Sequence, residues 1–509
     1  MSLLHRISSS LGARASSGKK RSLPPPSNVS TLLDFCSNDY LGMSLHPPTL
    51  PPCPLPAASG STGSRLLSGN SSVHLNCESY LQSVHRPSRS FPSPPSLKRA
   101  LLFNSGYDAN LSLLSSLPLS NDVVLLDELA HNSLQEGVRL SRTPRSNVHS
   151  FPHNDAHALH AKLLSLLRRV DGGRAVSPSS SVSVSSRSAF VVVESVYSMD
   201  GTIAPLSDLL AACASASLET GVFVHLIVDE AHGTGIYGET NLSDVLPDVM
   251  SCPRPFVPHP LDGFTQPLPP SAAVPAAVGG GGVVAALNLQ RHPNLLCSVH
   301  PFGKGVGRHG CVLVAHDSLF SGGGSGVPTT SLSTPTTITL PPPPPPPSSF
   351  SSSSSSSSSV AHQSNSQSTH PLLEYLYNYA RPLIYSTSLP PSSVWDVHAS
   401  YMYFSSPLGC VRRRRLFDNV SLFLELAKSA RLPMRGGARG PIQAVMTGSG
   451  GSQKCVDVAR TIREQGFDVM PIRAPTVKEG EERIRVVLHS HNEEEDIRRL
   501  VGVMRKAVA

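Results

Sequence analysis

Four apolar runs, each leading into a helix or loop, place the strongest constraint on how this chain can fold. They are ALLF (100–103), DVVLLD (122–127), AFVVVES (189–195) and VFVHLIVDE (222–230), and the segments that follow include NSGYDAN, SLQEGVRLS and LSDLLAACAS. Continuous aliphatic and β-branched runs are typical of strands covered on both faces. Their alternation with helices predicts an α/β fold with a large, mostly parallel sheet.

The order of predicted elements changes after about residue 385. PIQAVMTG, FDVMPI and RIRVVLHS resemble strands, while QKCVDVARTIREQG, ending at Gly466, and EEEDIRRLVGVMRKAV resemble amphipathic helices. We therefore expect three parts: an N-terminal extension (1–34), a large domain (35–385) and a smaller α+β C-terminal domain (386–509). Chemistry is expected at strand ends of the large domain, next to the small one.

Proline- and serine-rich blocks interrupt this pattern at 47–56 and at about 177–188, 253–282 and 321–370. Such segments cannot bury enough apolar surface to offset their conformational entropy, so we expect loops there.

The charge and cysteine patterns exclude several classes of protein. The net charge of +7 is spread along the sequence apart from Arg412–Arg415, without the interleaved aromatic residues of a nucleic-acid surface. The nine cysteines form no CxxC pair, so neither a zinc site nor a disulfide framework is indicated, and we expect no metal.

The N-terminus leaves the cellular location open. No apolar run is long enough for a membrane span. Residues 1–33 contain no acidic residue and many Arg and Ser, which fits an organellar transit peptide or an ordinary frayed terminus equally well. The expected location is cytoplasmic, or mitochondrial if this segment is a transit peptide.

Lys304 lies among glycines in SVHPFGKGVGRHG (298–310). A Walker phosphate loop is excluded, because a glycine follows the lysine and none stands five residues before Gly303. A Schiff-base lysine and a solvated lysine in a surface glycine loop remain, and the stretch alone favours the second.

Other candidate groups follow predicted strands. Asp229 ends a buried run, where a carboxylate is costly without a cationic partner. His131 and Ser198 lie in turns, and Gly106 and Tyr107 begin a helix whose N–H groups could hold a phosphate. Taken singly, capping and turn roles explain each as well as a catalytic role does.

Together with Lys304 and His232, these groups form the set that pyridoxal 5'-phosphate needs. The lysine would form the internal Schiff base, and Asp229 would keep the pyridine nitrogen protonated. His131 would stack on the ring, and His232 would lie near its phenolic oxygen.

Several stretches also resemble a known family. They include FCSNDYLGM (35–43), GSTGSRLLSGNSSVH (60–74), LLFNSGYDAN (101–110), LLDELAHNSLQEG (125–137), FPHND (151–155), VVESVYSMDGTIAPL (192–206), LIVDEAHGTGIYGE (226–239), FGKGVGRHG (302–310), RPLIYSTSLPP (381–391) and IRAPTVKEGEERIRVVLHSHN (472–492). In order and spacing they are similar to the α-oxoamine synthases. Those are homodimeric pyridoxal-phosphate enzymes of the aspartate aminotransferase fold (fold type I) that join an amino acid to an acyl-CoA with loss of carbon dioxide.

The resemblance implies a role for each candidate. Lys304, His131, Asp229 and His232 become the catalytic set; Gly106, Tyr107 and Ser198 become further cofactor contacts; Asn38 and Arg485 become substrate-binding residues, with Arg485 on the amino-acid carboxylate.

The segments 381–391 and 472–485 look most like the 8-amino-7-oxononanoate synthases of biotin synthesis, which use L-alanine and pimeloyl-CoA. Relatives resembling 5-aminolevulinate synthase, 2-amino-3-ketobutyrate CoA ligase or serine palmitoyltransferase remain alternatives, as does a non-catalytic partner subunit. Such subunits typically lack the lysine that this chain keeps.

Two features depart from the family pattern. Pro301 stands where relatives have a threonine that contacts the phosphate, and it offers neither a hydroxyl nor an N–H group. The stretch 42–60 is short and proline-rich where relatives have a helix that helps to build the dimer.

Overall fold

The computed structural model describes residues 2–16, 20, 23, 32–53, 58–85, 97–168, 170–171, 174–175, 187–238, 280–316, 368–436 and 439–508. The predicted loops at 177–188, 253–282 and 321–370 lie almost wholly outside these ranges, so those predictions stay untested.

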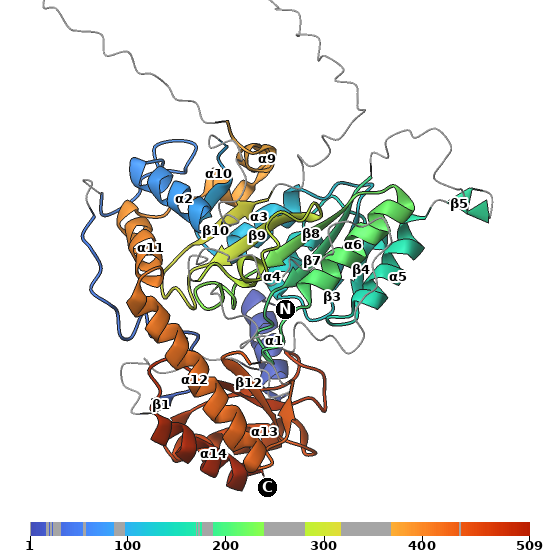
Figure 1. Cartoon of the computed structure of the whole chain (residues 1–509). Coiled ribbons are helices and arrows are strands. Elements are labelled where there is room, and N and C mark those ends of the chain that lie inside the picture. The colour runs from blue at the N-terminus through green and yellow to red at the C-terminus, as the bar shows by residue number, and fades with distance from the viewer. Residues whose placement is uncertain are drawn as a thin grey trace, which may run out of the picture.

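A seven-stranded sheet forms the centre of the large domain (Figure 1). Its spatial order is β2 (Ala100–Phe103), β10 (Cys311–Ala315), β9 (Leu295–Pro301), β8 (Val224–Asp229), β7 (Ala189–Glu194), β3 (Val123–Asp127) and β4 (Val148–Phe151). The pairs from β9 to β4 are parallel, and β10 runs antiparallel to both of its neighbours. The sheet is therefore mostly parallel, as the apolar runs predict.

Successive side chains of the strands pack into two separate cores, one on each face of the sheet. Val191 and Leu226 face one core, whereas Phe190, Val192 and Ile227 face the other. The first core includes α2 (Ser72–Val84), α5 (Ala156–Leu167) and α6 (Leu206–Thr220). The second includes α3 (Gly106–Ser116), α4 (Asn132–Arg139), α9 (Pro371–Tyr379) and α10 (Arg381–Tyr385). Helices thus cover both faces, which explains why the strands are apolar throughout.

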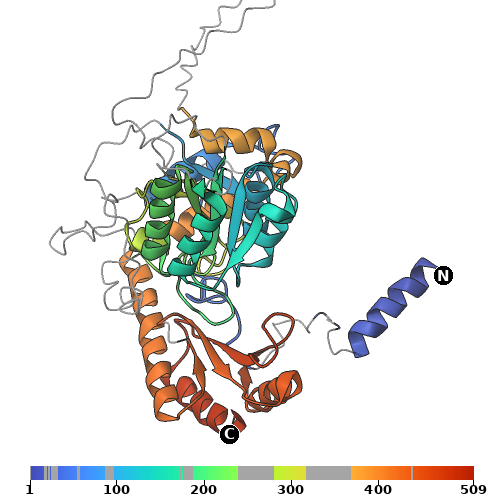
Figure 2. The ribbon, with the colours of Figure 1, turned by 90° about the vertical axis from the view of Figure 1, so that its right-hand side faces the viewer.

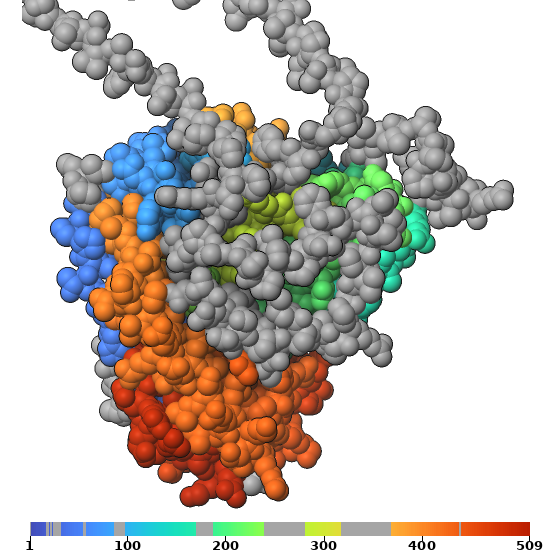
Figure 3. Space-filling model, in the orientation of Figure 1, coloured from blue at the N-terminus to red at the C-terminus, as the bar shows by residue number. Residues whose placement is uncertain are grey.

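The C-terminal part forms a second layer system below the first (Figures 1 and 3). Its four-stranded sheet has the order β11 (Met434–Arg435), β12 (Ile442–Met446), β15 (Arg483–Val487) and β14 (Met470–Ile472). It packs with α13 (Gly451–Glu464) and α14 (Glu494–Val508), and α12 (Pro407–Ser429) packs on α14. The long α12 and the preceding α11 (Pro391–Phe404) connect the two layer systems along one side (Figure 2).

A short N-terminal strand belongs with the C-terminal elements. β1 (Leu33–Asp34) pairs in parallel with β13 (Phe467–Asp468), and the Val487 N–H group donates to the Phe35 carbonyl oxygen at 2.8 Å. The chain therefore passes beside the small sheet before it enters the large domain.

The first helix, α1 (Leu3–Ser16), has no buried residue and stands apart from the body of the molecule (Figure 2). Within the described ranges, none of the helices combines the length and the apolar character needed to cross a bilayer. The remaining short elements are a 3₁₀ turn (Arg145–Asn147), β5 (Val170–Asp171), β6 (Arg174–Ala175) and α8 (Val283–Ala286).

The described residues on the two sides of three gaps lie close together in space. Around 239–279, the Gly235 N–H group donates to the Gly280 carbonyl oxygen at 2.9 Å. Around 317–367, the Ala315 N–H group donates to the Arg99 carbonyl oxygen, and the neighbouring Lys98 N–H group donates to the Ser368 carbonyl oxygen at 2.8 Å. Around 86–96, the Gln82 side chain bonds the Leu97 carbonyl oxygen at 2.9 Å.

One strand of the large sheet buries a histidine between two aromatic rings. His225 on β8 is 9% exposed, and its ring centroid lies 5.3 Å from that of Phe190 and 4.7 Å from that of Phe223. Burial lowers the pKa of His225 to about 4. The imidazole is therefore neutral in the folded protein at neutral pH.

We expect His225→Phe to reduce the acid sensitivity of the fold. The pKa of His225 is about 4 in the folded state and about 6.5 in the unfolded state. Between these pH values the unfolded state binds the extra proton, so the free energy of unfolding decreases by roughly 1.4 kcal/mol per pH unit as the pH falls. Phenylalanine keeps a ring in place but does not titrate. The measurement is the loss of Tm between pH 7.5 and 5.5, which should shrink in His225→Phe and stay unchanged in the exposed-site control His157→Phe. An equal loss in all three proteins would contradict the assignment.

Candidate active site

Two carboxylates end adjacent parallel strands and are both buried. Glu194 closes β7, Asp229 closes β8, and the two residues are register partners across the pair. They are 3% and 4% exposed. Two like charges placed together away from water are costly unless one is neutralised or a cation lies beside them.

Lys304 supplies the cation from the loop that joins β9 to β10. The loop is tightly enclosed by backbone: a Cβ atom on Gly305 would lie 2.6 Å from the Thr234 carbonyl oxygen, and one on Gly307 would lie 2.6 Å from Met43 Cβ. Gly307 also has a left-handed φ of 63°. The glycines are thus needed for close approach and for a turn, so the surface-loop interpretation of this stretch is not supported.

Burial shifts the titration of the amine and of its nearest carboxylic acid in opposite directions. The pKa of Lys304 is lowered, chiefly by burial and also by the charge of Arg485, while Asp229 and Glu194 oppose that shift. The pKa of Glu194 is raised well above its ordinary value, by burial and by the charge of Asp229. A lysine with a lowered pKa is a better nucleophile towards a carbonyl group.

A chain of side-chain hydrogen bonds ties His131 to Asp229. His131 caps α4, and its Nδ1 accepts from the Ser133 backbone N–H group at 3.2 Å. The Asn110 amide nitrogen donates both to Ser133 Oγ at 3.0 Å and to Asp229 Oδ2 at 2.7 Å. Burial, with a smaller contribution from Lys304, lowers the pKa of His131. The imidazole ring is therefore fixed in orientation and favoured in its neutral form.

His232 follows Asp229 by three residues and contacts a tyrosine from the N-terminal segment. Its Nδ1 lies 2.5 Å from the Tyr40 hydroxyl oxygen, which leaves Nε2 as the nitrogen available to a ligand. Burial, reinforced by the charges of Lys304 and Arg485, holds the pKa of His232 well below its usual range. Burial also raises the pKa of Tyr40 to about 12.

Arg485 reaches the site from the small domain. Ile484 and Val486 of β15 pack into the helix-covered core, so the alternating Arg485 side chain lies on the opposite face, towards the large domain. It donates from Nε to the Ser198 carbonyl oxygen at 2.6 Å and from Nη2 to Asn38 Oδ1 at 2.8 Å. Ser198 therefore contacts Arg485 through its backbone.

The start of α3 completes the set. The Asp108 N–H group donates to Ser105 Oγ at 3.0 Å, which makes Ser105 the cap. A Cβ atom on Gly106 would lie 2.4 Å from the Pro301 ring, so this helix start packs directly on the end of β9. The Tyr107 side chain is 44% exposed. The predicted phosphate contact of Tyr107 would therefore come from its backbone N–H group. Asp229, Lys304, His131 and Gly106 thus lie at the carboxyl ends of strands of the large sheet, and Arg485 reaches them from the small domain with Asn38 and the Ser198 carbonyl oxygen as partners.

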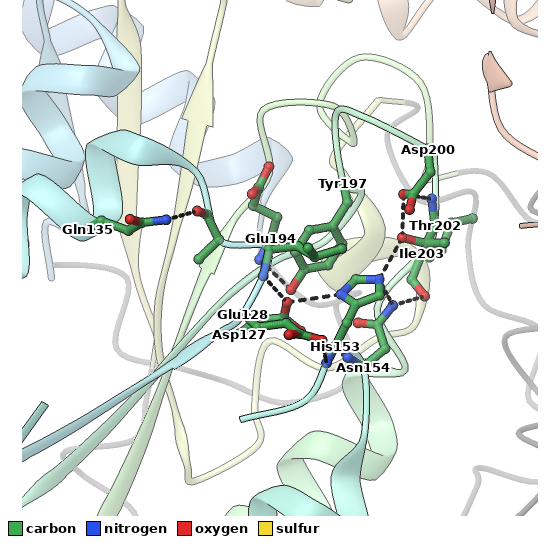
Figure 4. Close-up of polar contacts among 12 residues, drawn as sticks. Asp127, Glu128, Gln135, His153, Asn154, Glu194, Tyr197, Asp200, Thr202 and Ile203 are labelled. Atoms are coloured by element: carbon green, nitrogen blue, oxygen red, sulfur yellow. Dashed lines mark hydrogen bonds and ion pairs between the residues drawn. The ribbon is translucent and has the colours of Figure 1, made fainter. Parts of the chain in front are cut away.

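A second polar network holds the loop that follows Glu194 (Figure 4). His153 Nδ1 lies 2.9 Å from Asp127 Oδ1, and its Nε2 lies 2.8 Å from the Thr202 hydroxyl. The rings of His153 and Tyr197 meet edge to face, with their centroids 4.3 Å apart. The network fixes the turn that presents the Ser198 carbonyl group to Arg485.

Sequence reasoning did not identify Glu194, Asn110 or Tyr40 as site residues. All three lie inside the stretches that carry the family resemblance, but their residue types are common in turns and helix starts. The one local signal is Glu194, an acid directly after a buried strand like Asp229.

These groups fit pyridoxal phosphate. The donor set combines a partly buried amine of lowered pKa, a buried carboxylate for the pyridine nitrogen, an imidazole of fixed orientation and a helix start. Asn110 Oδ1 is buried and has no partner among the described residues, so Asn110 keeps an unused acceptor beside Asp229. At Pro301 the fit is poorer, since that residue offers no hydrogen-bond donor. The individual roles of these residues stay predictions.

Comparisons with known proteins identify the family. Residues 30–504 match the family described as Aminotransferase class I and II. Similar curated proteins include 8-amino-7-oxononanoate synthases of Cupriavidus taiwanensis, at 28% identity over 94% of this chain and 88% of the relative, and of Emericella nidulans, at 28% over 94% and 89%.

Solved structures share the fold at lower identity. A serine palmitoyltransferase of Sphingomonas wittichii has a TM-score of 0.64 at 21% identity, covering 100% of this chain and 98% of that one. The 8-amino-7-oxononanoate synthase of Francisella tularensis has a TM-score of 0.55 at 19% identity, covering 93% and 97%.

The expected fold type, cofactor and enzyme class are confirmed. The chain belongs to the class I and II aminotransferase family, as a pyridoxal-phosphate-dependent acyltransferase.

Proposed function

We propose that this enzyme condenses L-alanine with pimeloyl-CoA to give 8-amino-7-oxononanoate, CoA and carbon dioxide. The observation that carries the proposal is the pair formed by Arg485 and Asn38, within electrostatic reach of Lys304. It provides an anion-binding group for an amino-acid carboxylate next to the amine. The relatives named as 8-amino-7-oxononanoate synthases support the choice of substrates.

Each residue has a task in this proposal. Lys304 would hold the cofactor covalently through Nζ and, once released, would take the proton from the substrate Cα. Asp229, buried and fixed by Asn110, would hold the proton on the pyridine nitrogen. His131 would lie on the ring face, and His232 would donate from Nε2 near the phenolic oxygen.

When bound, pyridoxal phosphate supplies an electron sink for the carbanion formed at the amino-acid Cα. The protein orients the bonds that break. Arg485 would hold the carboxylate until carbon dioxide leaves, and the enclosed loop around Lys304 would keep water from the reacting centre.

The alternative amino-acid and acyl-CoA pairs are glycine with succinyl-CoA or acetyl-CoA, and serine with palmitoyl-CoA. The chain would bind each of these amino acids by the same carboxylate contact. The choice among the pairs therefore depends on side-chain and acyl-chain specificity. We further propose that the enzyme acts as a homodimer.

A substrate panel tests the proposed reaction. Alanine, glycine and serine are each combined with pimeloyl-, succinyl-, acetyl- and palmitoyl-CoA, and release of CoA is measured. We expect the highest kcat/KM for alanine with pimeloyl-CoA. Lys304→Ala should abolish both turnover and the visible absorbance of the bound cofactor, while the exposed control Lys478→Ala should keep both. A clear preference for any other pair would assign the enzyme to that reaction instead.

Arg485→Ala should raise the KM for the amino acid by about ten- to a hundredfold. A lost charge-assisted hydrogen bond to a carboxylate costs roughly 1.5–3 kcal/mol. The cofactor Kd should stay unchanged, because the expected cofactor contacts come from the large domain. Steady-state kinetics measure the KM and a cofactor titration measures the Kd, with Arg435→Ala on β11 as control. An unchanged KM would remove Arg485 from the substrate site.

Pro301→Thr should tighten pyridoxal-phosphate binding several-fold. A threonine hydroxyl beside Gly106 would add one hydrogen bond to a charged group, worth about 1.5–3 kcal/mol. Pro301→Val is the matched control, since it has the shape of threonine and restores the N–H group without the hydroxyl. Affinity is measured by titrating apo-protein and following cofactor absorbance. Equal affinities of the Thr and Val variants would show that a hydroxyl at this position does not reach the phosphate.

A further inference from the structure

Three potential metal ligands meet where the N-terminal strand joins the small domain. Asp34 ends β1, while His489 and His491 follow β15. Each residue offers one ligand atom, and these atoms all lie within 4.8 Å of one another. No role in the proposed reaction uses this cluster.

The Asp34 carboxylate is already oriented towards the cluster. Its Oδ1 accepts from the backbone N–H groups of Cys36 at 2.9 Å and Ser37 at 2.8 Å. The other oxygen, Oδ2, lies 3.8 Å from His489 Nε2. Oδ1 therefore accepts hydrogen bonds within the turn, and Oδ2 faces the imidazole group of His489 at Nε2.

His489 has the hydrogen-bond arrangement of a metal-binding histidine. Its side chain is fully buried, and its Nε2 lies 3.0 Å from the Ser37 carbonyl oxygen, which can only accept. Nε2 therefore carries the proton, and Nδ1 has the free lone pair. Nδ1 is buried and has no hydrogen-bond partner among the described residues. A ring N–H group bonded to a backbone carbonyl opposite a free ring nitrogen is the usual support of a histidine ligand.

His491 repeats this feature beside it. The two imidazole rings are stacked, with centroids 4.8 Å apart and an interplanar angle of 24°. His491 Nδ1 is likewise buried and unpartnered within the described ranges. The exposed ring of His46 has its centroid 5.0 Å from that of His491, so a fourth ligand or a water can complete the site.

The backbone around the cluster is held in place from both sides. The His489 N–H group donates to Asn492 Oδ1 at 2.7 Å, and the His489 carbonyl oxygen accepts from Asn419 Nδ2 at 2.9 Å. Asn492 also donates to the Asp34 carbonyl oxygen at 3.1 Å. Asn492 thus links the backbone of Asp34 to that of His489.

We propose that Asp34, His489 and His491 form a binding site for a divalent transition-metal ion such as Zn²⁺. Two imidazoles and one carboxylate suit zinc or cobalt, whereas magnesium and calcium prefer oxygen ligands. The ion would join β1 to the segment after β15; Asn38 follows β1 in the sequence, and Arg485 lies within β15. It would act as a clamp and would take no part in bond making.

The test is metal binding to the full-length holoenzyme after chelator treatment and desalting. Equilibrium dialysis against Zn²⁺, with metal quantified by mass spectrometry, should give one strongly bound ion per chain. Asp34→Asn keeps the turn acceptor but removes the charge, and His491→Ala removes one imidazole. Each should weaken Zn²⁺ binding at least tenfold. His160→Ala breaks the separate His160–Glu219 pair and should bind as the parent does.

A second readout identifies the ligands. Co²⁺ bound to the parent protein should give visible d–d absorption that His491→Ala lacks, and Mg²⁺ should not displace it. If His491→Ala does not fold, Asp34→Asn and the exposed His46→Ala replace it, the latter with a smaller loss. Absence of a tightly bound equivalent in the parent would overturn the proposal. So would binding that survives unchanged in Asp34→Asn and His491→Ala, because cysteines or other groups would then be the ligands.

Discussion

Two buried acids at the ends of β7 and β8 set the condition on which the rest of the site depends. Glu194 and Asp229 are register partners away from water, so the fold must supply a cation and hydrogen bonds there. The cation is Lys304, brought by a loop whose glycines allow close backbone contact, and the hydrogen bonds come from Asn110. Burial lowers the pKa of Lys304, and the two acids beside it oppose that shift.

The small domain contributes Arg485 to this site from strand β15. Because side chains alternate along β15, one face joins the helix-covered core, while the other directs Arg485 at the large domain. The N-terminal segment lies between the two domains, with Asn38 on Arg485 and Tyr40 on His232. A few residues of the N-terminal segment therefore link the small sheet to the carboxyl edge of the large sheet.

The strands of the large sheet and several candidate residues at their ends could be predicted from the sequence, because short local patterns indicate them. A buried apolar run is visible in the letters themselves, and a polar residue at its end, such as Asp229, marks the active edge of the sheet. Non-local pairings were not predictable. Nothing near Leu33 reveals its pairing with Phe467, and nothing in CVLVA (311–315) shows that β10 runs antiparallel to its neighbours. Asn110 was missed for the same reason, since its importance arises only when helix α3 meets strand β8, whereas Glu194 has the same local signal as Asp229.

The described residues that flank 86–96, 239–279 and 317–367 lie close together in space. In a loop whose ends already meet, the closure entropy grows only with the logarithm of its length, about 0.6 kcal/mol for each doubling. The described core thus fixes the ends of each stretch, and loops between such ends could vary in length at little cost to the fold. Proline tracts and serine runs between such ends are therefore compatible with the geometry at the carboxyl edge of the large sheet.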